Sequence, residues 1–253
     1  MDKTPKELQE NFKELIEIID REFSGERNKN LKKLYEFLED RIMFSPASGL
    51  EHYHNAWPGG YVDHVLRVIE CAQRLKRQWE EMGATINFTK EELMFSALNH
   101  DLGKLGDMDY EYYHVNESEW HIKNQGKIYE GSKEITHMPV PHRSLWMLQE
   151  FGIKVTQNEY IAIMSHDGIY DEGNATYLKT YLPERALKTN LPIILHHADH
   201  MASRIEYEKW KSTNPTKKKF IKDNSYRTPK KITNSNKNIN ANKLFADLFE
   251  GDK

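Results

Sequence analysis

The stretch TKEELMFSALNHDLGKLGD, residues 89–107, contains a helix pattern that ends in a His-Asp pair. Thr89 and Glu92 have the spacing of a capping box, which predicts a helix that begins after Thr89. The apolar run that follows leads directly to His100 and Asp101. A His and an Asp at the end of an apolar helix need partners, because buried polar groups without them are costly. We therefore expect residues elsewhere in the chain to complete a site around this pair.

Outward from this stretch, apolar residues recur at three- and four-residue spacing, which predicts amphipathic helices. We expect helices over residues 5–22, 30–43, 61–82, 89–102, 142–151, 157–166 and 190–211. The helix over 157–166 also begins with capping-box spacing, between Thr156 and Glu159. Strand-like alternation is scarce, so the expected fold is an all-α helical bundle. We expect N-terminal helices over 1–44 that pack on a core domain over 45–211, with a loop at 45–60, a long irregular insertion at 105–141 and a flexible tail at 212–253.

Imidazole and carboxylate residues stand on five of the expected helices, where they can converge on one point. They are His64, His100, Asp101, His142, His166 and Asp199. Helical bundles build metal centres from side chains on facing helices. Imidazole and carboxylate suit Mn, Fe, Zn or Co, and two neighbouring ions can activate water for phosphoryl displacement. Any one of these His, taken alone, is more simply explained as a hydrogen-bonded structural residue. The set as a whole predicts a centre for two divalent ions.

Several segments resemble the HD-domain superfamily of metal-dependent phosphohydrolases: GGYVDHVLRV, NHDLGK, PHRSLWML, SHDG and HHADHMASR. The family pattern is a His, a His-Asp pair and a distal Asp, and His64, His100, Asp101 and Asp199 match it in order. The subgroup with two metal ions adds two His, which His142 and His166 match. The resemblance covers roughly residues 45–210. It implies an all-α HD bundle that holds two divalent ions, with Mn or Fe favoured.

Within the superfamily, the chain is most similar to 3′→5′ exoribonucleases of the YhaM type. The likeness lies in EHYHNAWPGGYVDH, residues 51–64, in HDLGK and in the SHDG segment. Those enzymes usually carry an OB-fold ahead of the HD domain, whereas residues 1–44 of this chain have a helical pattern. A nucleotide or another small phosphodiester is therefore as suitable a substrate as single-stranded nucleic acid.

The resemblance implies catalytic roles for Asp101, which would bridge the ions, and for Lys104, which would neutralise a substrate phosphate. Further candidates for substrate binding are Arg143, His54, His196, Tyr112 and Trp120. Aromatic residues of the insertion, among them Tyr113 and Tyr129, can stack on a base. Each of these residues also has an explanation without a binding role. Lys104 can be a surface lysine and His54 a solvent-exposed loop histidine. The aromatic residues can simply pack the insertion onto the body of the protein.

Charge and cysteine content limit which classes of protein this chain can belong to. The formal net charge is −3, but residues 212–243 carry nine Lys/Arg against one Asp, so the body is acidic and the tail is basic. The chain has one cysteine, Cys71, which excludes a disulfide framework and indicates a reducing compartment. No apolar run approaches the ~18 residues of a membrane span. We expect a cytoplasmic protein with no membrane partner.

The end of the chain has an apolar motif of its own. In NKLFADLFEGDK, the apolar residues from Leu244 to Phe249 recur at helical spacing after a Lys- and Asn-rich run. The motif is similar to C-terminal peptides by which some phage replication proteins bind a sliding clamp, which implies a protein partner of that kind. The alternative is a terminal helix that packs back on its own domain.

Three functions from different classes remain open. The first is a phosphohydrolase that cleaves a nucleotide or single-stranded nucleic acid with metal-activated water. The second is an HD-fold mixed-valent diiron oxygenase resembling myo-inositol oxygenase, since the ligand pattern is the same. The third is a noncatalytic adaptor tethered to a replisome. The intact ligand set argues against the adaptor, and the aromatic, Lys-bearing insertion and basic tail favour the hydrolase.

Overall fold

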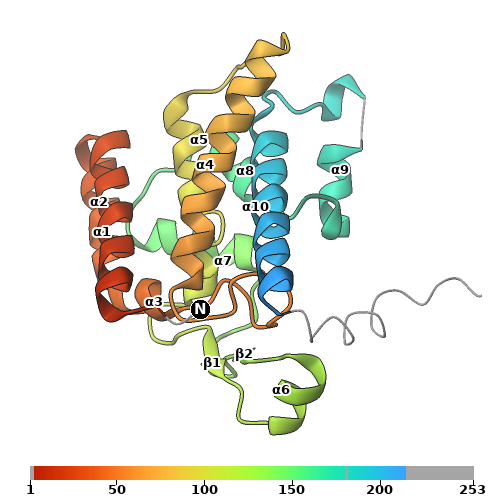
Figure 1. The fold of residues 1–253 in the computed structure, drawn as a ribbon. Helices are drawn as coiled ribbons and strands as arrows, with labels where there is room; N and C mark the ends of the chain where they lie inside the picture. The colour runs from red at the N-terminus through yellow and green to blue at the C-terminus, as the bar shows by residue number, and fades with distance from the viewer. Residues whose placement is uncertain (1–2, 180–181, 215–253) are drawn as a thin grey trace, which may run out of the picture. The chain divides into compact units, whose positions relative to one another are not determined.

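The computed structural model describes residues 3–179 and 182–214, and these residues are mostly helical (Figure 1). They belong to one compact unit. The predicted tail, apart from its first residues, lies outside the described residues, and so does the Leu244–Phe249 motif. Among the described helices, none is long and apolar enough to cross a membrane.

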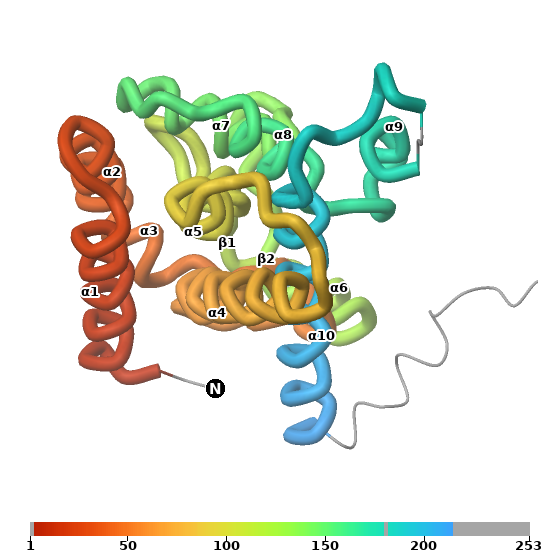
Figure 2. Tube along the Cα trace, turned by 90° about the horizontal axis from the view of Figure 1, so that it is seen from above, coloured from red at the N-terminus to blue at the C-terminus, as the bar shows by residue number. Residues whose placement is uncertain are grey.

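Four helices form a closed ring around the core: α4 (Gly60–Glu81), α5 (Lys90–Asn99), α8 (Gln157–Met164) and α10 (Leu191–Thr213). Each of them contacts the next in the order α4, α5, α8, α10, and α10 returns to α4 (Figure 2). Helix α5 is buried at every position from Glu92 to Asn99, as expected for a central helix with apolar residues on all sides. The other three helices of the ring, α4, α8 and α10, therefore cover α5, and the C-terminal ends of α5 and α8 lie close to α4 and α10.

The capping boxes predicted for α5 and α8 are confirmed. The Thr89 hydroxyl accepts from the Glu92 amide, and the Glu92 carboxylate accepts from the Thr89 amide. Thr156 and Glu159 make the same reciprocal pair at α8. These bonds satisfy backbone donors that a helix start leaves free, which explains why both helices begin where the sequence predicts.

The N-terminal helices pack against this ring. Helix α1 (Pro5–Glu22) has the predicted bounds, but the single helix predicted over 30–43 is wrong. It is two helices, α2 (Gly25–Phe37) and α3 (Glu39–Phe44), with a break at Leu38. The Leu38 side chain is fully buried, so the break turns the chain while keeping this residue in the shared hydrophobic core.

The insertion has more regular structure than we expected. Strands β1 (Tyr113–Val115) and β2 (Tyr129–Gly131) pair antiparallel, and α6 (Glu119–Gln125) lies between them in the chain. We call residues 113–131 the insertion hairpin. Each strand has three residues, which is too short for alternation to be visible in the sequence.

The remaining helices and turns support the ring. Helix α7 (Val140–Glu150) packs on the 3₁₀ turn η1 (Leu102–Leu105), which follows the His-Asp pair. Between α8 and α10 come η2 (Gly168–Tyr170), η3 (Glu172–Asn174), α9 (Ala175–Leu178) and η4 (Pro183–Arg185), which the sequence pattern did not predict.

Candidate metal centre

Three buried histidines come from three different helices of the ring. His64 lies in the second turn of α4, His100 is the C-terminal cap of α5, and His166 follows α8 by two residues. Their side chains are between 0 and 2 % exposed. Two consecutive glycines allow the start of α4, because Gly59 has a left-handed φ of 80° and a Cβ on Gly60 would collide with the Asn55 carbonyl.

Helix ends orient two of these imidazoles. The Nδ1 atom of His100 lies 2.9 Å from the Ala97 carbonyl, and that of His166 lies 2.7 Å from the Ile163 carbonyl. A carbonyl only accepts hydrogen bonds, so Nδ1 donates its proton and the lone pair is left on Nε2. Both bonds use carbonyls of the last helical turn, whose i+4 amides lie beyond the end of the helix.

A carboxylate orients the third imidazole. Glu206 on α10 is 2 % exposed, and its Oε2 lies 3.0 Å from Nδ1 of His64. Its other oxygen accepts from Nε of Arg67 at 3.1 Å. Carboxylates often hold metal-bound histidines in this way, since they fix the ring and raise its basicity. Glu206 is not among the residues predicted from the sequence, although it lies seven residues after Asp199, two helical turns along the same face.

The Nε2 atoms of the three histidines converge on Asp101. The Asp101 Oδ2 atom lies 3.5 Å from Nε2 of His64 and 3.4 Å from Nε2 of His100. Its Oδ1 atom lies 3.5 Å from Nε2 of His166. Asp199 on α10 adds a second carboxylate, with Oδ1 3.1 Å from Nε2 of His64. Four elements of the ring thus supply three imidazoles and two carboxylates to one buried point.

The arrangement fits a divalent cation. The donor atoms of His64, His100 and Asp101 lie within 4.8 Å of one another, and so do those of His100, His166 and Asp199. Among the described residues, the buried Nε2 atoms of His64 and His100 lie near carboxylate oxygens but have no partner in hydrogen-bond geometry. Buried polar atoms without a partner are rare and call for an explanation, and a bound ion supplies one. Nitrogen and oxygen donors of this kind suit Mn, Fe, Zn or Co.

The charges of the centre reinforce this fit. Burial by itself lowers the pKa of His64, but the Glu206 and Asp199 carboxylates outweigh it and raise that pKa to about 10. His166 is similar, because Asp101 and Asp167 outweigh burial and raise its pKa to about 9. Burial raises the pKa of Asp101, yet Lys104 and His100 hold it well below its usual range. The carboxylates therefore stay charged, and they favour a proton or a metal cation on the imidazoles.

His142 lies elsewhere. It sits in the first turn of α7 with an exposed side chain, and it belongs to neither ligand group formed by the described residues. Its neighbours explain this position, because Pro141, Arg143 and Ser144 are buried and turn His142 outward. The structure brings together five of the six residues that we predicted as ligands.

Helix α7 instead supports the turn that carries the His-Asp pair. The Ser144 hydroxyl accepts from the Gly103 amide at 2.8 Å and donates to the His100 carbonyl at 3.0 Å. Arg143 donates to the carbonyls of Gly103 and Met138, each at 2.9 Å. Its guanidinium is thereby engaged with the backbone, so a phosphate-binding role for Arg143 is not supported by its position.

Lys104 lies at the edge of the centre, in contact with Asp101. Its Nζ atom is 2.7 Å from Oδ2 of Asp101, and its side chain is 15 % exposed. Although burial alone would lower the pKa of Lys104, Asp101 raises it, so the amine stays charged. Lys104 also lines a cavity of about 320 Å³.

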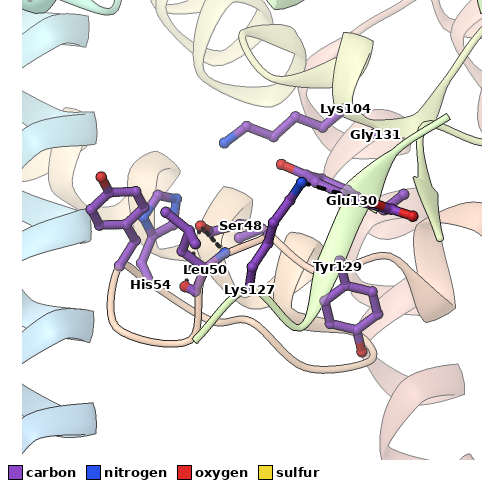
Figure 3. Close-up of a pocket in the computed structure, with 12 residues that line it drawn as sticks. Ser48, Leu50, His54, Lys104, Lys127, Tyr129, Glu130 and Gly131 are labelled. Carbon is purple, nitrogen blue, oxygen red and sulfur yellow. Dashed lines mark hydrogen bonds and ion pairs between the residues drawn. The ribbon is translucent and has the colours of Figure 1, made fainter. Parts of the chain in front are cut away.

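This cavity lies between the 45–59 loop and the insertion hairpin (Figure 3). Its walls are formed by Ala47, Ser48, Gly49, Leu50, Tyr53, His54, Lys104, Tyr113, Lys127, Tyr129, Glu130 and Gly131. His54 connects the cavity with the metal centre, because its ring centroid lies 4.8 Å from that of His64. Its volume is at the small end of the range for ligand pockets, which suits a small ligand.

The other predicted binding residues do not line this cavity. Tyr112 stacks against Arg143, whose guanidinium lies 4.8 Å from the ring centroid. Trp120 is 60 % exposed and packs edge-on against His121 in α6. The Nδ1 atom of His196 donates to the His166 carbonyl, 2.9 Å away, and His196 therefore supports a candidate ligand residue.

We compared the chain with known proteins. No protein-family model, no curated protein and no solved structure matches it. The chemistry of the centre and of its cavity is therefore the basis for assigning a function.

Proposed function

We propose that the protein is a metal-dependent phosphohydrolase of HD-domain type that cleaves a phosphoester of a nucleotide or of single-stranded nucleic acid. One observation carries the proposal. Three buried imidazoles, each with its Nδ1 atom engaged, direct Nε2 toward Asp101, whose carboxylate also contacts the Lys104 amine at the edge of a cavity.

A bound divalent ion would supply a Lewis acid that acidifies water and polarises a phosphoryl oxygen. His64, His100, His166, Asp101 and Asp199 would hold that ion, with Mn or Fe favoured. Their burial keeps bulk water away from the centre, which strengthens every charge interaction in it. Asp101 would be the residue shared with a second ion, because its two oxygens face different imidazoles, whereas the one free nitrogen of His100 can serve a single ion.

Lys104 has two functions in this proposal. Its positive charge offsets part of the negative charge of Asp101, and its amine is placed to hold a phosphate oxygen as a point charge. A substrate in the cavity would lie between Lys104 and the insertion hairpin, with its scissile phosphate toward His54 and the metal centre. The chain's own groups thus position the phosphate.

The test is hydrolysis by metal-stripped protein without oxygen, with and without added Mn²⁺. The panel contains nucleoside monophosphates, cyclic nucleotides, and single-stranded RNA and DNA. We expect phosphate or nucleotide release that needs Mn²⁺ and is lost in Asp101→Asn. Asp109→Asn is the matched control, because Asp109 lies exposed eight residues further on.

Absence of release from the whole panel would contradict the proposal. Iron-dependent consumption of O₂ by the same protein would then favour the diiron oxygenase. Turnover that persists in Asp101→Asn would also overturn the proposal, because that variant removes the carboxylate charge that faces all three imidazoles.

A further inference from the structure

A second lysine lines the cavity, and it comes from the insertion hairpin. Lys127 and Glu130 form part of the cavity wall together with Lys104. In Figure 3 the Lys127 side chain rises from the hairpin toward the side of the cavity on which Lys104 lies. The cavity thus presents two cations from different elements, one next to the metal centre and one on the hairpin.

The backbone around Lys127 is held in place. Lys127 forms an isolated antiparallel bridge with Leu50 of the 45–59 loop. On either side of it, the Glu51 amide donates to the Gly126 carbonyl at 2.7 Å, and the Tyr129 amide donates to the Gly49 carbonyl at 3.1 Å. These bonds join the hairpin to the loop that carries His54. Lys127 is therefore set at a defined position relative to the centre.

The charge of Lys127 is available for a ligand. Lys104 is engaged with Asp101 at 2.7 Å, whereas Lys127 lies 3.7 Å from Glu130 in a pair whose side chains are 37 and 35 % exposed. An exposed pair at this distance contributes little stability, so an anion can replace Glu130 as the partner of Lys127. Glu130 also lowers the attraction of this wall for anions, since its carboxylate lines the same cavity.

We infer that Lys127 binds a second phosphate group of the substrate, remote from the scissile one, and that Glu130 weakens this contact. The inference rests on the proposed function, because Lys104 and the metal centre take the scissile phosphate. A contact between Lys127 and a second phosphate favours substrates with two phosphates, such as a nucleoside 3′,5′-bisphosphate or a short oligonucleotide, over a nucleoside monophosphate.

The test compares KM for adenosine 5′-monophosphate, adenosine 3′,5′-bisphosphate and an unphosphorylated adenylate trinucleotide. In Lys127→Ala we expect the KM ratio of bisphosphate to monophosphate to rise about tenfold, as for loss of one charge-assisted contact. In Glu130→Gln we expect that ratio to fall roughly threefold. A rise confined to the trinucleotide would assign Lys127 to an internal phosphate, and a rise confined to the bisphosphate would assign it to a terminal one.

Lys123→Ala is the control. Lys123 lies in α6 of the same insertion, pairs with Glu119 and is 72 % exposed, so its loss changes the net charge equally without touching the cavity. The inference would be overturned by an equal effect of Lys123→Ala. It would also be overturned if Lys127→Ala left the KM ratios of both bisphosphate and trinucleotide to monophosphate unchanged. If the wild type hydrolyses none of these compounds, the affinity for adenosine 3′,5′-bisphosphate is measured by calorimetry in the wild type and in Lys127→Ala instead. Binding about tenfold weaker in Lys127→Ala supports the inference, and equal or absent binding refutes it.

Discussion

Asp101 is the residue on which the charges of the centre converge. Its two oxygens face Nε2 of three imidazoles, and Oδ2 also contacts the Lys104 amine. Glu206 acts one step further out, because it contacts His64 and not Asp101. Single residues therefore have one of two roles in the centre. Asp101 and the imidazoles would contact an ion, and Glu206 orients one of those imidazoles.

Glu206→Gln should weaken metal binding about 10- to 100-fold, which is typical for loss of a partner that orients a ligand. The neutral amide removes the negative charge that raises the basicity of His64. Competition with a chromophoric chelator measures the Mn²⁺ affinity. Glu208→Gln, an exposed change on the same helix, should leave that affinity as it is. Equal affinities of Glu206→Gln and wild type would contradict an orienting role.

His142→Ala should retain the wild-type ratio of metal to protein, whereas His166→Ala should lose metal. The reason is position, because His142 is exposed outside both ligand groups and His166 is buried within one of them. Elemental analysis after dialysis against Mn²⁺ measures this ratio. Loss of one ion per chain in His142→Ala would show that α7 turns to supply a ligand when metal binds.

At the scale of helices and turns, the ends of α5 and α8 have two functions. Each end places a candidate ligand histidine three residues after a carbonyl of the last helical turn, and the imidazole Nδ1 donates to that carbonyl. The same bond caps the helix and sets the tautomer of the ring. The starts of α5 and α8 are joined as well, because Glu92 of α5 accepts from the Thr156 hydroxyl at 3.0 Å and from Asn158 at 2.9 Å.

Glu92 should make the stability of this helix pair depend on pH. Burial raises the pKa of Glu92, but bonds from Thr89, Asn158 and Thr156 lower it below the ordinary 4.5. A lowered pKa in the folded state means stability that is present above pH 4.5 and lost as the pH falls through the folded value. In Glu92→Gln this part of the pH dependence should disappear, with a loss of about 1 kcal/mol at pH 7.

Urea unfolding at several pH values between 3 and 7 measures the effect of Glu92→Gln. Glu91→Gln is a suitable comparison, since Glu91 is 47 % exposed in the same helix turn. A difference between Glu92→Gln and wild type that stays constant over this pH range would show that the carboxylate does not titrate with folding.

At the scale of the whole molecule, the centre connects the ring. Its five candidate ligands come from α4, α5, α8 and α10 and from the turn after α5, and the same helices share one hydrophobic core. A cation held by all of them binds the folded state and not the unfolded chain. Metal binding should therefore stabilise the entire domain.

Mn²⁺ at about 100 times its Kd should stabilise the folded protein by about 2.7 kcal/mol. Calorimetric or fluorescence-monitored melting with and without Mn²⁺ measures this gain. Asp199→Asn should lose most of it, because Asp199 belongs to one of the two ligand groups. Asp109→Asn should keep it. An equal gain in Asp199→Asn would place the cation outside this centre.

Local sequence patterns were enough to predict the helices that carry the candidate site. Helical spacing and the two capping boxes are local signals, and α1, α4, α5, α8 and α10 appear close to the predicted bounds. Short-range patterns cannot encode which face of a helix a neighbour covers. His142 shows this limit, because α7 packs on η1 through Arg143 and Ser144 and so turns His142 to solvent.

Contacts between distant segments determine which groups surround the candidate ligands. Glu206 reaches His64 over a sequence separation of 142 residues, and the insertion hairpin meets the 45–59 loop through backbone bonds that leave no residue pattern. The sequence predicted six ligands, and the structure brings five of them together. Their orienting partners and the wall of the cavity depend on contacts between distant segments, and the free energy of those contacts is set by packing of the whole domain.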